Sequence, residues 1–189
     1  MKYCLDDAYS TSTDNGYGKQ LAEQRFKILK QLKPFTSVLD VGSGSCLLQK
    51  WLNNNIQHKV DYEAVDIRED ALALCDCVKY TIIPVNKNYD ISCLFGTITY
   101  NIDLDATKNK QILINLLLQC KNISKQIIFT VLKETTEFKI LKYKRNKFVY
   151  FSKEEIKNML EKLEINLVAI IETDLDPDEY FVICEINNA

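Results

Sequence analysis

Short apolar runs alternate with helix-forming segments along most of the chain, and this alternation is the feature that most constrains its fold. Five runs have the length and apolar character of buried strands, and we expect these strands at residues 37–41, 62–67, 80–85, 90–96 and 126–132. Helices are expected at residues 19–32, 47–55, 68–76 and 108–120. Regular alternation of this kind predicts a largely parallel sheet with helices on both faces.

The last third of the chain ends this alternation with two successive strands. Ser152 and Glu155 have the spacing of a capping box, which predicts a helix that begins directly after Ser152. Strands are expected at 165–172 and 179–186, joined by a turn-rich segment with no room for a crossover helix. Since parallel neighbours need a crossover of about a dozen residues or more, these two strands should be antiparallel. The predicted fold is a doubly wound α/β domain whose mostly parallel, seven-stranded sheet ends in an antiparallel hairpin.

Composition narrows the function classes. The chain has 189 residues and a formal net charge of −2, so nothing in its overall charge attracts it to nucleic acid or to acidic membranes. The first 14 residues are unlike a signal peptide, and no apolar run approaches 18 residues. Seven cysteines, an odd number, are scattered without a CxxC pair, and His58 is the only histidine. These features predict a cytoplasmic protein with reduced cysteines and no zinc site.

Two of only five glycines lie together in the stretch VLDVGSGSC, residues 38–46. Gly42, Ser43 and Gly44 directly follow the first predicted strand, where glycine lets the backbone bend sharply and lets a ligand lie against it. In an open parallel sheet, ligands bind at the carboxyl ends of the strands, where the strand order reverses. The turn is therefore a candidate binding loop, with a plain tight turn as the alternative.

The residues around these glycines distinguish two kinds of ligand. The dinucleotide fingerprint G-x-G-x-x-G requires glycine at position 47, where this chain has Leu47. The pattern acidic-x-G-x-G-x-small fits better, with Asp40 at its head and Cys46 at its end. At these residues the sequence resembles the first motif of the class I S-adenosylmethionine-dependent methyltransferases. Many members of that family have a third glycine where this chain has Cys46.

Two later strand ends extend the resemblance. Asp66 ends the second predicted strand, where the resemblance implies that its carboxylate accepts hydrogen bonds from both ribose hydroxyls of an adenosine ligand. A helix cap is the alternative role for Asp66. In the family, Ile67 would lie against adenine, and Asn86, after the third predicted strand, could bond the adenine edge. Phe95 and Gly96 match the fourth-strand tip, which borders the methyl group and the acceptor.

The resemblance covers nearly the whole chain in element order and implies S-adenosyl-L-methionine as the cofactor. The cofactor-binding residues that it implies are Asp40, Gly42, Ser43, Gly44, Cys46, Asp66, Ile67, Asn86, Phe95 and Gly96. Residues 19–189 would form the single methyltransferase domain. Residues 1–18 would form an N-terminal arm that either folds over the cofactor as a lid, through Tyr9, Tyr17 and Gly18, or frays.

The reaction implied by the resemblance is in-line displacement of the methyl group by an unidentified acceptor, with a small molecule favoured. No catalytic residue is identified, although Tyr17, Tyr100 and Asp103 are candidates for a general base. A non-catalytic, cofactor-binding partner subunit is an alternative, motivated by Cys46 and by the missing catalytic signature. A third hypothesis is a nicotinamide-dependent oxidoreductase, which Asp40 and Leu47 argue against.

Nucleic acid is a further candidate acceptor, because residues 139–151 interleave basic and aromatic side chains. The basic residues of this segment are Lys139, Lys142, Lys144, Arg145 and Lys147. A solvated loop or hairpin whose aromatic side chains pack inward is the favoured interpretation. The fourth motif, LFGT, is also unlike the Asn/Asp-Pro-Pro-aromatic tetrad of DNA and RNA amino-methyltransferases.

Overall fold

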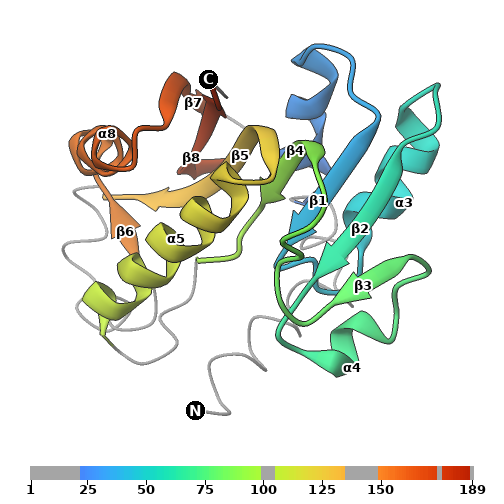
Figure 1. Cartoon of the computed structure of the whole chain (residues 1–189). Coiled ribbons are helices and arrows are strands. Elements are labelled where there is room, and N and C mark those ends of the chain that lie inside the picture. Colours follow the sequence, from blue (N-terminus) through green and yellow to red (C-terminus); the bar gives the residue numbers. More distant parts are fainter. Residues whose placement is uncertain (1–21, 99–104, 135–148, 174–175, 188–189) are drawn as a thin grey trace.

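The computed structural model describes residues 22–98, 105–134, 149–173 and 176–187, which form one mixed β-sheet with helices against both faces (Figure 1). The strands are β1 (Ser37–Val41), β2 (Asp61–Val65), β3 (Val78–Tyr80), β4 (Tyr89–Leu94), β5 (Ser124–Lys133), β6 (Tyr150–Phe151), β7 (Asn166–Thr173) and β8 (Asp176–Glu185). The helices are η1 (Lys27–Gln31), α3 (Leu47–Asn55), α4 (Glu69–Leu72), α5 (Ala106–Lys121) and α8 (Lys153–Lys162). The sheet order is β3-β2-β1-β4-β5-β8-β7, with β6 paired to β5.

The pairing confirms the predicted doubly wound fold. Along the order β3-β2-β1-β4-β5, each strand is parallel to the next, and the short β6 is parallel to β5. Strand β8 is antiparallel both to β5 and to β7, so the predicted C-terminal hairpin is confirmed as well. The short strand β6 was not predicted, because two residues are too few to show an alternating pattern.

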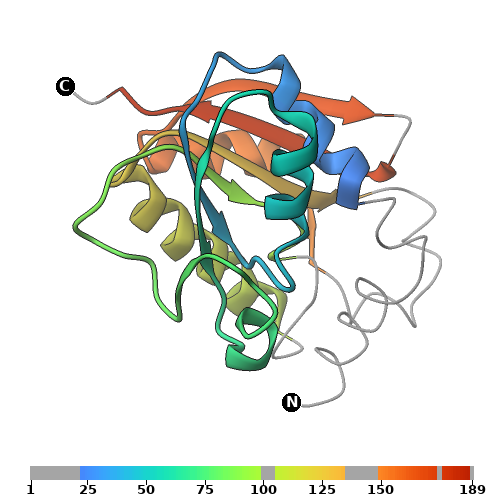
Figure 2. The same cartoon turned by 90° about the vertical axis from the view of Figure 1, so that its right-hand side faces the viewer.

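Each face of the sheet has its own apolar core, because successive side chains of a strand point to opposite faces. On one face, Leu39 of β1 and Phe129 of β5 belong to a buried cluster with side chains of α5 and α8. On the other face, Val38 and Ile128 belong to a cluster with side chains of η1 and α3. Figure 2 shows these two pairs of helices on opposite sides of the strands. The central strands are thus held from both sides, which fixes the positions of their carboxyl ends.

The predicted third strand is wrong in position. It was expected at residues 80–85, but β3 is Val78–Tyr80, where its residues pair with Glu63 to Val65 of β2. In the apolar run that follows, Ile83 is buried, whereas Ile82 and Val85 are 76% and 79% exposed. The run is a connection that leads to β4 without a helix. A strand was predicted there only because the residues of the run are apolar.

The helices agree better with the sequence, with one exception. Residues 22–26 are α-helical and continue as the 3-10 helix η1, while α3 and α5 lie where helices were expected. The helix expected over residues 68–76 is reduced to the single turn α4. Within the described part of the chain, no helix has both the length and the apolar character that crossing a bilayer would require.

Helix α8 begins with the predicted capping box. The Ser152 hydroxyl accepts a hydrogen bond from the Glu155 amide at 3.1 Å, and the Glu155 carboxylate accepts one from the Ser152 amide at 2.8 Å. Replacing Ser152 with alanine removes the acceptor at the helix start, so Ser152→Ala should lower the free energy of unfolding by about 1 kcal/mol. Urea denaturation measures this change. Ser152→Asn, which restores a capping acceptor, should leave stability nearly unchanged, and equal losses in both variants would contradict the cap.

Candidate functional site

The carboxyl ends of β2, β1 and β4 lie side by side, because these strands are neighbours in the sheet. The chain leaves β1 toward β2 on one side and reaches β4 on the other, so the strand order reverses at β1. Open α/β sheets bind their ligands at such a reversal, outside the carboxyl ends of the strands. The residues that follow these three strands therefore define the candidate functional site.

The turn after β1 has a special backbone conformation. Gly42, Gly44 and Cys46 have φ angles of 77°, 53° and 56°, in the left-handed region that favours glycine. The amides of Gly42 and Ser43 both donate to the carbonyl of Val65 at the end of β2, at 2.7 and 3.1 Å. The turn is thus fixed against the neighbouring strand. Cys46 is not a glycine, but its backbone takes the same left-handed conformation.

Thr97, from the segment after β4, packs against the bare backbone of Gly42. The Thr97 hydroxyl donates to the Val41 carbonyl at 2.6 Å. A Cβ atom added at Gly42 would lie 2.7 Å from both Oγ1 and Cγ2 of Thr97, closer than side-chain atoms approach one another. Gly42 is therefore required twice, once for its positive φ and once for this close contact.

The carboxylate of Asp66 joins the ends of β1 and β2. One oxygen accepts a hydrogen bond from the Gly44 amide at 2.9 Å, and the other accepts one from the Arg68 amide, also at 2.9 Å. Asp66 is only 5% exposed. The glycine turn and the acidic residue, which the sequence placed at adjacent strand ends, are in direct contact.

Asp40 is buried at the end of β1 and is 5% exposed. Burial raises the pKa of Asp40 to about 7, a hydrogen bond from the Tyr62 hydroxyl at 2.6 Å opposes this rise, and the nearby charge of Asp66 adds to it. At neutral pH the Asp40 carboxyl group is therefore close to its titration midpoint. A cationic group bound beside it would favour the ionised form.

The hydroxyl oxygen of Ser43 lies in the same turn, is inaccessible to solvent and has no hydrogen-bond partner among the described residues. Buried polar atoms in native proteins nearly always have a hydrogen-bond partner, so a buried hydroxyl oxygen without one needs an explanation. A ligand could pair with this oxygen only if the atoms that cover it moved aside.

The other predicted residues are placed unevenly around this turn. Gly96 lies two residues after β4 and has a φ of 71°, and its amide donates to the Thr130 hydroxyl at 2.8 Å. Phe95, between β4 and Gly96, packs on Phe26 with ring centroids 5.7 Å apart. Ile67 follows Asp66 and is 72% exposed, so its side chain is available for a contact. Asn86 is exposed in the connection, six residues beyond β3 and three before β4 begins.

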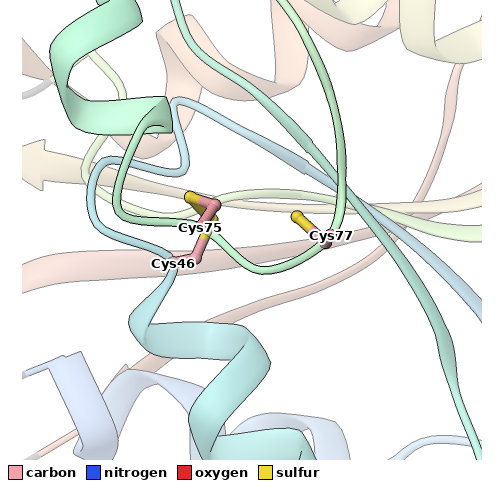
Figure 3. Close-up of side chains that lie close together, drawn as sticks. All are labelled: Cys46, Cys75 and Cys77. Carbon is pink, nitrogen blue, oxygen red and sulfur yellow. A yellow bond between two sulfur atoms is a disulfide. The ribbon is translucent and has the colours of Figure 1, made fainter.

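The structure joins Cys46 to Cys75 in a disulfide, which corrects the prediction that the cysteines are reduced (Figure 3). Cys46 closes the glycine turn, and Cys75 lies between α4 and β3, so the bond ties two segments of the site together. The sulfur of Cys77 lies beside this pair. The sequence offered a weak signal, because a Cys-x-Cys pair follows the strand that neighbours the glycine turn. The pairing itself depends on the fold, which brings together residues 29 positions apart.

Several predictions fall outside the described residues. They concern the arm and lid at residues 1–18, the candidate bases Tyr17, Tyr100 and Asp103, and the basic side chains of residues 139–147. Of the basic and aromatic segment, the structure describes residues 149–151. There Phe151 is buried, and the Lys110 ammonium lies 4.9 Å from the centre of its ring. This one aromatic side chain packs inward, as the favoured interpretation expected.

Comparisons with known proteins identify the fold. No family model matches the sequence, and no curated protein matches it. An S-adenosylmethionine-dependent methyltransferase from Clostridium acetobutylicum ATCC 824 superposes with a TM-score of 0.64 at 11% identity, over 92% of this chain and 93% of that one. Magnesium protoporphyrin IX methyltransferase from Synechocystis PCC 6803, solved with bound S-adenosylmethionine, gives 0.57 at 10% identity, over 98% of this chain and 83% of that one. The chain has the methyltransferase fold.

Another solved structure has a similar fold. The pyocyanin biosynthetic protein PhzM superposes with a TM-score of 0.65 at 18% identity, over 89% of this chain. The chain spans about half of PhzM, since the match covers 55% of that protein. The resemblance that the motifs suggested is thus confirmed at the level of the fold. Identities of 10–18% carry no information about the acceptor.

The contact between Gly42 and Thr97 makes a specific prediction. Gly42→Ala should lower the free energy of unfolding by about 2 kcal/mol or more, because a positive φ costs an L-residue 1–2 kcal/mol and the new methyl group also overlaps Thr97. Urea denaturation measures the loss. Thr97→Ser removes one of the two overlapping atoms and keeps the hydroxyl, so the double variant should lose less than the sum of the two single variants. Strict additivity would show that the two positions are independent.

The raised pKa of Asp40 makes a second prediction. The unfolded chain releases the Asp40 proton near pH 4, whereas the folded protein keeps it until about pH 7, so the folded state loses stability as the pH rises through this window. Asp40→Asn removes the titration and keeps an acceptor for Tyr62. The free energy of unfolding of Asp40→Asn relative to wild type should therefore rise by about 4 kcal/mol between pH 4 and pH 8. A difference that stays constant with pH would show that folding does not raise the pKa of Asp40.

Proposed function

We propose that the protein binds S-adenosyl-L-methionine and transfers its methyl group to an acceptor. The observation that carries this proposal is the hydrogen bond from the Gly44 amide to the Asp66 carboxylate, at the point where the strand order reverses. It places a bare, strongly bent loop beside a carboxylate. The fold around them is the one that solved S-adenosylmethionine-dependent methyltransferases share.

The residues of the site suit the parts of this cofactor. The Asp66 carboxylate offers acceptor oxygens for the two ribose hydroxyls, and the exposed Ile67 offers an apolar surface to adenine. The turn from Gly42 to Cys46 would take the amino acid portion. Asp40, whose pKa is raised to about 7, would supply negative charge near the amino group.

The bound cofactor would supply a methyl group on a sulfonium, which an acceptor nucleophile displaces in line. The protein then contributes mainly alignment, which can be worth roughly 7–11 kcal/mol relative to the free bimolecular reaction. The end of β4 would border the acceptor, and its backbone is held in place by the bond from the Gly96 amide to Thr130. The ring of Phe95 packs against the ring of Phe26, so Phe95 would offer the acceptor an apolar surface that is fixed in position.

The acceptor that we favour is a small molecule. The residues that follow β4 read Phe95, Gly96 and Thr97, and they do not form the proline-containing tetrad with which amino-methyltransferases hold a nucleic acid base. A non-catalytic partner subunit was considered because Cys46 replaces a glycine. The left-handed backbone of Cys46 weakens that argument, since the turn keeps the conformation that the glycine would give it.

Isothermal titration calorimetry with S-adenosylhomocysteine tests the assignment of the site. Asp66→Asn keeps the size of the side chain but loses an acceptor oxygen and the charge, and hydrogen bonds to charged groups are worth about 1.5–3 kcal/mol each. We therefore expect the affinity to fall by at least about tenfold. Asp70→Asn is the matched control, because Asp70 is four residues away, exposed and paired with Arg68. Its affinity should equal that of wild type.

An unchanged affinity of Asp66→Asn would overturn the site, and an absence of binding by wild type would overturn the proposed function. Melting temperatures of both variants separate lost binding from a disturbed turn. Turnover is measured separately, with methyl-labelled cofactor and a panel of small-molecule and nucleic acid acceptors. Tight binding without transfer to any of them would favour the non-catalytic alternative.

A further inference from the structure

Three cysteine sulfurs lie together at the edge of the candidate site. The Sγ atoms of Cys46, Cys75 and Cys77 are all within 4.8 Å of one another (Figure 3). Cys46 is contributed by the start of α3, and the other two come from the segment between α4 and β3. The remaining cysteines that the structure describes, Cys93, Cys120 and Cys184, are buried elsewhere and do not belong to this group.

The disulfide uses only two of the three sulfurs. A dithiol reductant would deliver two electrons and two protons to the Cys46–Cys75 bond and leave three thiols in one place. In a reducing compartment, where disulfides rarely persist, the reduced form would be the usual one. Clustered cysteines in such a setting more often bind a metal or act in catalysis than form a structural bond.

The geometry of the cluster suits a thiolate-bound cation. Zinc–sulfur bonds are about 2.3 Å long, so tetrahedral ligands place their sulfurs about 3.8 Å apart. The three sulfurs already lie within 4.8 Å, and reduction would release the bonded pair to move apart. Cys46 and Cys75 are buried and Cys77 is half-buried, so a cation would be shielded on two sides and accessible from the third.

The charge beside the cluster is favourable. The Lys79 ammonium donates to the carbonyls of Leu72 and Cys75, at 3.0 and 2.9 Å, which holds it next to the cluster. Burial raises the pKa of Cys77, and the positive charge of Lys79 partly offsets this rise. A divalent cation with three thiolates carries one net negative charge, which this ammonium would balance. Thiolate ligands select soft cations such as Zn²⁺ over Mg²⁺ or Ca²⁺.

We propose that, once the Cys46–Cys75 disulfide is reduced, Cys46, Cys75 and Cys77 bind one Zn²⁺ ion, with water as the fourth ligand. The disulfide and the metal exclude each other, because both require the sulfurs of Cys46 and Cys75. Binding displaces the thiol protons to solvent, and no further oxidant or reductant takes part. Either state fixes Cys46 at the end of the glycine turn, and the proposal does not depend on cofactor binding.

Metal titration of the full chain tests this proposal. Protein reduced with a phosphine, kept free of oxygen, is titrated with Zn²⁺ in competition with a chromophoric chelator, and in parallel with Cd²⁺ while thiolate-to-metal charge-transfer absorbance is recorded. We expect one ion per chain. Cys77→Ser should weaken Zn²⁺ binding by at least about a hundredfold, since even the loss of an outer-shell partner costs 10–100-fold. The Cd²⁺ absorbance should fall by about a third, from three thiolates to two.

The control variant is Cys120→Ser, whose cysteine is buried on the opposite face of the sheet and should not affect the metal. Oxidised wild type, with the disulfide verified by thiol counting, should bind no Zn²⁺ at this site. The proposal is overturned if reduced wild type does not bind, if Cys77→Ser binds as tightly as wild type, or if the oxidised protein retains the site. Circular dichroism checks that each variant is folded, and Cys77→Ala serves as a second variant.

Discussion

The hydrogen bond between the Gly44 amide and the Asp66 carboxylate is the contact on which the site depends. It joins two segments that follow neighbouring strands, and two further constraints hold the same turn. The amides of Gly42 and Ser43 donate to the Val65 carbonyl, and the disulfide to Cys75 fixes Cys46 at the end of the turn. Buried charge-assisted hydrogen bonds are stronger than neutral ones, and their partners are costly to leave unpaired. The shape of the turn is therefore set before any ligand arrives.

The sheet makes this contact possible because it is packed on both faces. The helices α5 and α8 cover one face, and η1 and α3 cover the other, so β1 and its neighbours have little freedom to shift. Rigid strands carry loops whose conformations are special, such as the left-handed residues after β1 and β4. This division of roles, with stability in the strands and chemistry in the loops, is common to α/β proteins. Preorganisation of this kind reduces the entropy that binding would otherwise cost.

The sequence predicted the features that are encoded locally. Ser152 and Glu155 marked the start of α8, and Gly42, Gly44 and Asp66 marked two strand ends, because each feature follows from residue type and spacing. The predicted position of β3 was wrong, because the apolar character of a run does not reveal which of its residues pair with β2. The disulfide was missed for a similar reason, because residues 46 and 75 meet only in the folded chain. The contact of Thr97 with Gly42 depends in the same way on the order of the strands.

The connection between β3 and β4 gives this protein an uneven distribution of local stability. Its residues, 81–88, form no helix. A single buried side chain of this segment, Ile83, anchors it to the core, and Lys87 ties it to β2 through an ion pair with Glu63. Opening such a segment exposes little apolar surface and breaks few bonds, so its free energy lies far below that of unfolding the whole sheet. The connection can therefore open locally while the strands that carry the glycine turn stay closed.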